Sequence, residues 1–301
     1  MLPFFLPMTH TAYIGRFAPT PTGPLHFGSL LAALASYLDA KAHAGCWLVR
    51  IEDLDPPRED PHASASILRT LDAYGLHHDG EVRYQSLQTA RYQERLDQLI
   101  AQNLAFPCQC SRTQLAGQVH LGRCQMTSSR DCAWRFLNHK ERWCFDDRIQ
   151  GRHCEELRLL GDFILKRRDG PWAYQLAVVS DDIDQDITHI VRGIDLIDST
   201  ARQAQLYQAL QQPLPSYAHI PVALESNGQK LSKQNLARPL SLHHVENTLF
   251  AALVWLKQNP PLELKGSRDE LLRHAIAHWH IENLQGLHSQ SAPNDFLLTP
   301  S

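Results

Sequence analysis

One stretch near the N-terminus sets the architecture, Arg16-Phe-Ala-Pro-Thr-Pro-Thr-Gly-Pro-Leu-His-Phe-Gly-Ser29. Apolar residues before it predict a strand over 13–17, and a run rich in alanine and leucine after it predicts a helix over 29–44. A second strand is predicted over 46–51. Strand, glycine-containing turn, helix and strand in this order are typical of a parallel sheet with crossover helices, so we expect an α/β fold.

The remaining chain continues this pattern with one interruption. The segment 106–168 contains six of the 7 cysteines and has weak periodicity, so we interpret it as an inserted subdomain. This divides the chain into 1–105 and 169–238 as two halves of a catalytic domain, the insertion 106–168, and a helical C-terminal region 239–301. Further helices are predicted over 62–74, 90–103, 200–210, 249–256 and 270–278, and further strands over 173–179, 187–194 and 217–224.

The overall composition is that of a soluble globular enzyme. Of 301 residues, 43% are hydrophobic and 20% are charged, and the formal net charge is −3. Non-specific nucleic-acid binding proteins are usually basic, so this charge gives no support for that class. Residues 1–8 are apolar but lack a basic region and carry two prolines, and no apolar run reaches ~18 residues. We expect a cytoplasmic monomer with no signal peptide and no membrane partner.

The first stretch places a histidine and a glycine just before a helix. A helix N-terminus presents free N–H groups and the positive end of the dipole, and therefore attracts phosphate. His26 adds a hydrogen-bond donor beside such an anion, and Gly28 removes a side chain where a nucleotide can approach the backbone. A histidine and a glycine alone are more often part of an ordinary surface loop. The full 14-residue context favours a nucleotide site.

A second motif follows the last predicted strand, Lys230-Leu-Ser-Lys-Gln234. Attack of a carboxylate on the α-phosphate of ATP builds negative charge on the phosphates, and ammonium groups can stabilise that charge. Two lysines in a polar loop are usually only solvated. Their order and distance relative to the first stretch favour a role in catalysis.

Together the two motifs resemble the HIGH and KMSKS motifs of class I aminoacyl-tRNA synthetases, over residues 13 to 238. Ala-Pro-Thr-Pro-Thr-Gly before Leu-His is similar to the glutamate-type version, and the four letters of the first motif here are His-Phe-Gly-Ser. The resemblance implies a Rossmann-like catalytic domain in which His26 and Lys233 are catalytic. It implies ATP contacts, with Mg²⁺ arriving on ATP, from His26, Gly28, Ser29, Lys230, Ser232 and Lys233.

The resemblance also implies an amino-acid pocket built mainly by Arg16, Glu52, Tyr174 and Arg192. The two arginines would clamp the side-chain carboxylate of glutamate, Tyr174 would hydrogen-bond to it, and Glu52 would take the α-ammonium. Arginine cannot accept a hydrogen bond from an amide, which favours glutamate over glutamine. Each of these residues alone fits a structural ion pair equally well. The neighbouring loop residues Phe17, Ala18, Pro19 and Thr20 complete the predicted pocket.

The cysteines indicate a metal site rather than a disulfide framework. The pattern Cys108-x-Cys110-x₉-His120-x₃-Cys124 suits one structural zinc, with Cys132 as a substitute if His120 is not used. In the short paralogues of glutamyl-tRNA synthetase the third ligand is a tyrosine, and here it is His120. Asp181 and Asp182 read as capping the turn after the strand 173–179, or alternatively as a metal pair.

The C-terminal region separates the possible functions. Only 67 residues follow Gln234 (301 − 234), which is too few for an anticodon-binding domain. This matches the stand-alone paralogues of glutamyl-tRNA synthetase, and the resemblance implies tRNA-independent activation of glutamate and its transfer to the queuosine base in the anticodon of tRNA(Asp). The alternatives are a truncated enzyme that charges the 3′ end of tRNA(Glu), and a non-catalytic tRNA-binding module. The retained motif residues argue against the latter.

Overall fold

The predicted βαβ unit is confirmed in a computed structural model, which describes residues 12–124, 131–231 and 238–296. Strand β1 (Ile14–Phe17) leads into helix α1 (Phe27–Ala42), and strand β2 (Cys46–Ile51) returns parallel to β1. The helix ends where the N–H of Gly45 bonds to the carbonyl of Ala40. A side chain at this glycine would collide with the backbone of Tyr13, 2.4 Å away, so only glycine fits the turn.

The central sheet reverses its strand order beside β1. On one side lie β2 and β3 (Arg83–Tyr84), and all three strands are parallel. On the other side the N–H of Thr188 bonds to the carbonyl of Ile14 at 3.0 Å, which sets β9 next to β1. The sheet then continues through β9 (His189–Gly193), β10 (Ser216–Ile220), β6 (Arg142–Asp147) and β7 (Gly151–Glu156). Such a reversal opens a crevice at the carboxyl ends of the strands.

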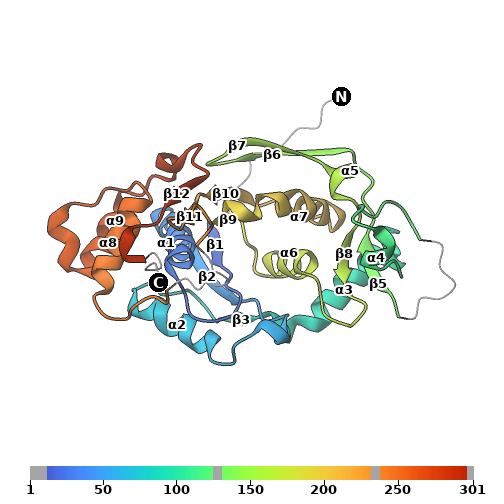
Figure 1. The fold of residues 1–301 in the computed structure, drawn as a ribbon, viewed down its shortest axis with the longest axis horizontal. Coiled ribbons are helices and arrows are strands. Elements are labelled where there is room, and N and C mark those ends of the chain that lie inside the picture. The colour runs from blue at the N-terminus through green and yellow to red at the C-terminus, as the bar shows by residue number, and fades with distance from the viewer. Residues whose placement is uncertain (1–11, 125–130, 232–237, 297–301) are drawn as a thin grey trace.

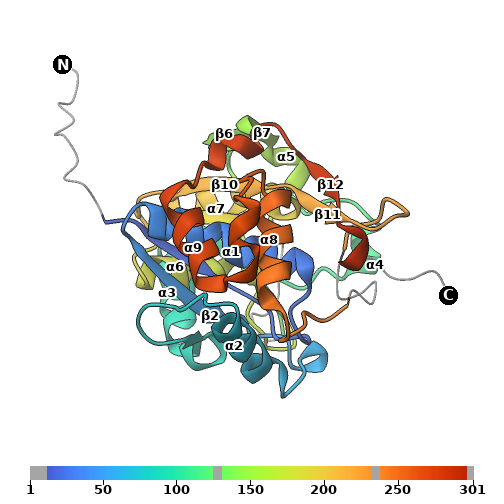
Figure 2. The same ribbon diagram turned by 90° about the vertical axis from the view of Figure 1, so that its left-hand side faces the viewer.

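Helices cover both faces of this sheet (Figure 1). One face is covered by α1, over which the C-terminal helices α8 (Val245–Trp255) and α9 (Arg268–Ala277) pack, as Figure 2 shows. The opposite face carries α6 (Tyr174–Asp184) and α7 (Ile197–Ala209), which share a second core with α3 (Thr89–Ala101). Helix α2 (Ala63–Ala73) packs on the first core. The predicted helices over 62–74, 90–103, 200–210, 249–256 and 270–278 are therefore confirmed.

The segment 106–168 has two parts. An antiparallel sheet of β4 (Ala105–Cys108), β5 (Ala133–Phe136) and β8 (Phe163–Lys166) forms one end of the molecule, with the short helices α4 (Arg112–Leu115) and α5 (Leu157–Leu160). The hairpin of β6 and β7 instead joins the central sheet through β10. Cys144 and Cys154 face each other in this hairpin and form a disulfide, a pair that was not predicted from the sequence.

The strand predicted over 173–179 is wrong. Residues 174–179 lie in the buried helix α6, because a short apolar run fits a buried helix as well as a strand. Asp181 and Asp182 consequently lie within that helix and cap no turn. The strand predicted over 217–224 divides at Pro221, and its second part, β11 (Val222–Leu224), pairs with β12 (Ser289–Ser291). Among the described residues, none of the helices combines the length and apolar character needed to cross a membrane.

Candidate active site

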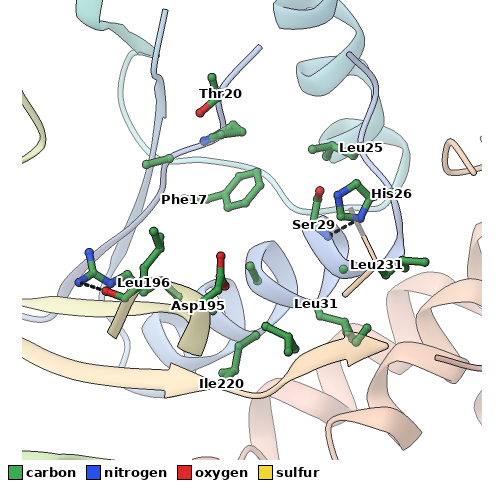
Figure 3. A pocket seen from close by; sticks show the side chains of 18 of the residues that line it. Phe17, Thr20, Leu25, His26, Ser29, Leu31, Asp195, Leu196, Ile220 and Leu231 are labelled. Carbon is green, nitrogen blue, oxygen red and sulfur yellow. Dashed lines mark hydrogen bonds between the residues drawn. The ribbon is translucent and has the colours of Figure 1, made fainter. Parts of the chain in front are cut away.

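A cavity of about 520 Å³ opens at the carboxyl ends of β1, β2, β9 and β10, where the strand order reverses (Figure 3). Its lining includes residues predicted to bind the amino acid and residues predicted to bind ATP. Ser232 and Lys233 lie outside the described residues. The predicted residues that line the cavity are Arg16, Phe17, Ala18, Pro19, Thr20, His26, Gly28, Ser29, Glu52, Tyr174, Arg192 and Lys230.

His26 caps the helix that begins at the cavity. It has extended backbone geometry, and its Nδ1 accepts a hydrogen bond from the N–H of Ser29 at 3.2 Å, a contact drawn in Figure 3. A neutral imidazole that accepts at Nδ1 carries its proton on Nε2, and therefore has a donor on the opposite side of the ring. His26 is therefore a helix cap that can also offer a donor, and the cap was not predicted from the sequence.

Gly28 makes room for the imidazole and for the second motif. A Cβ atom at this position would lie 3.1 Å from the His26 ring and 3.5 Å from the carbonyl oxygen of Leu231. The first distance is tighter than normal packing allows. The two predicted ATP motifs therefore meet at this glycine.

The second motif reaches the cavity through the hairpin after β11. Lys230 forms an ion pair with Asp195 at 2.5 Å, and both residues line the cavity. The chain that follows returns to the first motif, since the N–H of Leu240 bonds to the carbonyl of Leu25 at 2.8 Å. Asp195 was not predicted from the sequence, because a single acidic residue between Ile194 and Leu196 matches neither motif.

The two arginines of the predicted amino-acid pocket are anchored differently. Arg16 donates its Nε–H to Asp182 of α6 at 3.2 Å, and its terminal nitrogens make no hydrogen bond to the part of the chain that the structure describes. Arg192 donates from all three of its nitrogens to protein acceptors. Arg16 is therefore able to present its fork of terminal N–H groups to a carboxylate, whereas Arg192 has one terminal N–H left for such a partner.

An ion-pair network beneath the cavity supports these side chains. The guanidinium of Arg50 is fully buried and lies 2.8 Å from Asp182, 3.6 Å from Glu52 and 3.8 Å from Asp181. Asp182 thus connects Arg50 with Arg16. The pKa of Asp182, although burial acts to raise it, is held below its usual range by these two arginines. Arg50 was not predicted as part of the site, although a lone charge within an apolar strand indicates a buried partner.

Glu52 follows β2 and is held in place by its own backbone, whose N–H bonds to the carbonyl of Pro19. Its Oε1 is buried and accepts no hydrogen bond from the described residues. Burial raises the pKa of Glu52 to about 7, despite the opposing effect of Arg50. A buried carboxylate oxygen without a donor suits a cationic ligand such as an ammonium group. Burial also raises the pKa of Tyr174, which keeps its phenol protonated and able to donate.

The Glu52 pKa predicts a pH dependence for glutamate use. Below pH 7 the Glu52 carboxyl is neutral in the empty site and cannot pair with an ammonium; above pH 7 it is ionised. We expect kcat/KM for glutamate to fall about tenfold per pH unit below this pKa and to level off above it. Glutamate-dependent ATP–pyrophosphate exchange measured across neutral pH tests this, with Glu52→Gln as a control of low and pH-independent kcat/KM. A wild-type profile that stays flat through pH 7 contradicts it.

A second cavity, of about 540 Å³, adjoins the first. Thr20, Glu52, Arg58 and Tyr174 line both. Beyond these shared residues the second cavity is bordered by Arg167 and Arg168 and by the cysteine cluster at Cys110. The two cavities therefore share a wall formed by these four residues, and the second lies on the side of the inserted segment.

The predicted metal ligands lie together. One ligand atom from each of Cys108, Cys110, His120 and Cys124 is within 4.8 Å of the others, and Cys132 is not part of this group. Nε2 of His120 lies 3.4 Å from the sulfur of Cys108 and 3.0 Å from that of Cys124. The other ring nitrogen lies 3.0 Å from the buried Asp162, which is the usual outer partner of a metal-binding histidine. This group can hold a metal ion.

Comparison with known proteins agrees with this geometry. The family model "tRNA synthetases class I (E and Q), catalytic domain" matches residues 14–142 and 123–258. The chain belongs to this family. It is 47% identical to the glutamyl-Q tRNA(Asp) synthetase of Chromobacterium violaceum in an alignment of 289 residues that covers 92% of this chain and 97% of that protein. It is 48% identical to the glutamyl-Q tRNA(Asp) synthetase of Vibrio vulnificus over 288 residues, 94% and 95% of the two chains.

A solved structure shares the fold at low sequence identity. The glutamate tRNA ligase of Elizabethkingia meningosepticum, solved in complex with its amino acid, superposes with a TM-score of 0.78 at 21% identity. The match covers 95% of this chain and 68% of that chain. The predicted α/β class I synthetase fold is therefore confirmed.

Proposed function

We propose that this chain activates glutamate with ATP, without needing tRNA, and transfers the glutamyl group to the queuosine base in the anticodon of tRNA(Asp). The observation that carries the activation step is the shared cavity, in which a carboxylate-binding fork, a buried carboxylate and the N-terminus of α1 face one space. The acceptor rests on the names of the relatives that share almost half of the sequence. Because ATP, glutamate and tRNA are its proposed substrates, we propose that the enzyme acts in the cytoplasm.

In the first step an α-carboxylate oxygen of glutamate attacks the α-phosphorus of ATP and pyrophosphate leaves. Arg16 and one N–H of Arg192 hold the side-chain carboxylate, Tyr174 donates to it, and Glu52 receives the ammonium. The phosphates lie at the N-terminus of α1, where the Nε2–H of His26 stabilises charge that develops in the transition state. Gly28 and Ser29 allow the nucleotide to approach, and Lys230, Ser232 and Lys233 act on the departing pyrophosphate.

In the second step a hydroxyl of the queuosine ring attacks the activated carbonyl carbon and AMP leaves. The acceptor has to reach the glutamyl group from a side that ATP does not occupy. The second cavity meets this need, because it opens onto Glu52 and Tyr174 and carries the arginines Arg167 and Arg168. Arginines beside a nucleotide can bind its phosphates.

Exchange of labelled pyrophosphate into ATP tests the activation step. We expect exchange that depends on glutamate and proceeds in the absence of tRNA, with glutamine a much poorer substrate because the arginine fork requires an anionic acceptor. Exchange that appears only after tRNA is added, or that is supported equally by glutamine, would contradict the proposal.

We further propose that the Cys108, Cys110, His120 and Cys124 group holds one structural zinc ion. Three thiolates and an imidazole are a usual tetrahedral zinc set, and Asp162 fixes the imidazole. The ion would stabilise the β4–β5–β8 sheet and take no part in chemistry.

Cys110→Ser tests the metal site. We expect the wild-type protein to contain one zinc ion per chain by elemental analysis and the variant to contain none. The Tm of the variant should be several degrees lower, because metal binding contributes to folding. Cys46→Ser is the matched control, because Cys46 is exposed and lies outside the cluster. Equal zinc content in both variants would refute the assignment.

A further inference from the structure

Arg192 is fixed in the cavity wall by a histidine on the neighbouring strand. Arg192 in β9 and His219 in β10 are register partners, and the Nε–H of Arg192 donates to Nε2 of His219 at 3.0 Å. The terminal nitrogens of Arg192 donate to Gln203 at 2.9 Å and to Thr200 at 2.8 Å. The carbonyl of Leu196 accepts from Arg192 as well. Nε2 of His219 is thus one of four acceptors that position this guanidinium, and it can serve as one only if it carries no proton.

Asp147 determines whether Nε2 of His219 carries a proton. Nδ1 of His219 lies 2.6 Å from Oδ2 of Asp147, and both side chains are fully buried. A carboxylate accepts, so Nδ1 carries the proton and Nε2 presents a lone pair to Arg192. Desolvation lowers the pKa of His219 to about 4, so the ring is neutral at physiological pH. The other oxygen of Asp147 accepts the backbone N–H groups of Ile149, Gln150 and His219, which fixes the carboxylate.

We propose that Asp147 and His219 are positioning residues for Arg192: Asp147 selects the His219 tautomer whose Nε2 holds the Arg192 guanidinium in the orientation that binds the substrate carboxylate. This inference rests on the proposed function, because it takes the ligand of Arg192 to be glutamate. It gives the segment 106–168 a part in amino-acid binding, since Asp147 ends strand β6 and pairs with Tyr217 of β10.

Asp147→Asn tests the proposal with little change of shape. The amide oxygen keeps the three backbone hydrogen bonds, and the amide nitrogen replaces the oxygen that faces Nδ1. Because the amide nitrogen is a donor, Nδ1 of His219 has to accept, and the ring proton moves to Nε2. There two donors, this N–H and the Nε–H of Arg192, face each other across 3.0 Å, and the hydrogen bond is lost. We expect the KM for glutamate in ATP–pyrophosphate exchange to rise about 10- to 100-fold, as for a lost hydrogen bond to a charged group. The kcat and the KM for ATP change much less.

The matched control is Asp146→Asn, one residue earlier in β6, where the side chain is exposed and pairs only with Arg152 among the described residues. It leaves the KM for glutamate unchanged.

A second pair of variants covers the case in which Asp147→Asn does not fold. His219→Gln retains an acceptor for Arg192, whereas His219→Asn retains only a donor toward Asp147, so the KM rises more in His219→Asn.

Nitrogen chemical shifts of ¹⁵N-histidine-labelled protein provide a readout that does not depend on activity. We expect His219 to carry its proton on Nδ1 in the wild type and on Nε2 in Asp147→Asn. A wild type protonated on Nε2, or a tautomer change without a change in the KM for glutamate, would overturn the proposal. If the wild type shows no glutamate-dependent exchange, the proposed function fails, and the histidine spectra still decide whether Asp147 sets the tautomer.

Discussion

His26→Ala is expected to lower kcat for glutamate-dependent ATP–pyrophosphate exchange about 10²- to 10³-fold, with a small effect on the KM for glutamate. Removal of one preorganised donor from a site of developing negative charge typically has an effect of this size. The change also removes the side chain that caps α1, since Nδ1 of His26 accepts the N–H of Ser29. Loss of the cap lowers the free energy of unfolding by about 1 kcal/mol.

Two matched variants separate the cap from the chemistry. His26→Asn places an oxygen near the position of Nδ1, so it should cap the helix and restore stability, yet remain as inactive as His26→Ala. His26→Gln places an amide near the position of Nε2, so it should retain more activity while losing the cap. Steady-state exchange kinetics and chemical denaturation measure both properties. Near wild-type activity in His26→Asn would show that His26 serves only as a helix cap.

Arg50→Met is expected to lower the free energy of unfolding by about 3–5 kcal/mol at neutral pH. Its guanidinium is fully buried between the carboxylates of Glu52, Asp181 and Asp182. Its removal takes away the ion-pair partner of Glu52 among the described residues, and leaves Asp181 with Arg83 and Asp182 with Arg16 as the remaining partners. In the variant these carboxyls have raised pKa values, so each takes up a proton as pH falls. The loss of stability should therefore be largest at high pH and shrink in acid.

The control for this prediction is Arg91→Met. Arg91 also pairs with a carboxylate of α6, Asp184 at 2.9 Å, but its side chain is 45% exposed. We expect a loss of less than about 1 kcal/mol, because exposed ion pairs contribute little. Urea denaturation of the two variants at several pH values compares them directly. Equal losses in both, or a loss in Arg50→Met that grows in acid, would contradict the role given to the buried network.

Local signals in the sequence were enough to predict the first half of the site. Residues 16–29 specify their own turn and helix start, because proline, glycine and a capping side chain act over a few residues. The cysteine spacing likewise placed Cys108, Cys110, His120 and Cys124 together, and the structure confirms that these four can share one metal ion. The order and distance of the two ATP motifs along the chain favoured a shared role in catalysis, and described residues of both motifs line one cavity.

The supporting interactions were not predictable in the same way, because they join residues that are distant in sequence. Helix α6 was predicted as a strand, and its buried Asp181 and Asp182 pair with arginines of β1, β2 and β3, which are distant in sequence. The contact between Asp147 and His219 spans 72 residues, so no local pattern indicates it. The motifs identify the residues of the site, whereas these long-range pairs set the orientation of their side chains.

The measurement that tests the central claim most directly is transfer of labelled glutamate to tRNA from two cell types, one able to make queuosine and one not. The label is then located by nuclease digestion. The proposed function predicts label only on queuosine-containing tRNA(Asp), within the anticodon fragment. Equal labelling of both tRNA pools, with label on the 3′-terminal adenosine, would identify ordinary charging of tRNA(Glu) and contradict it.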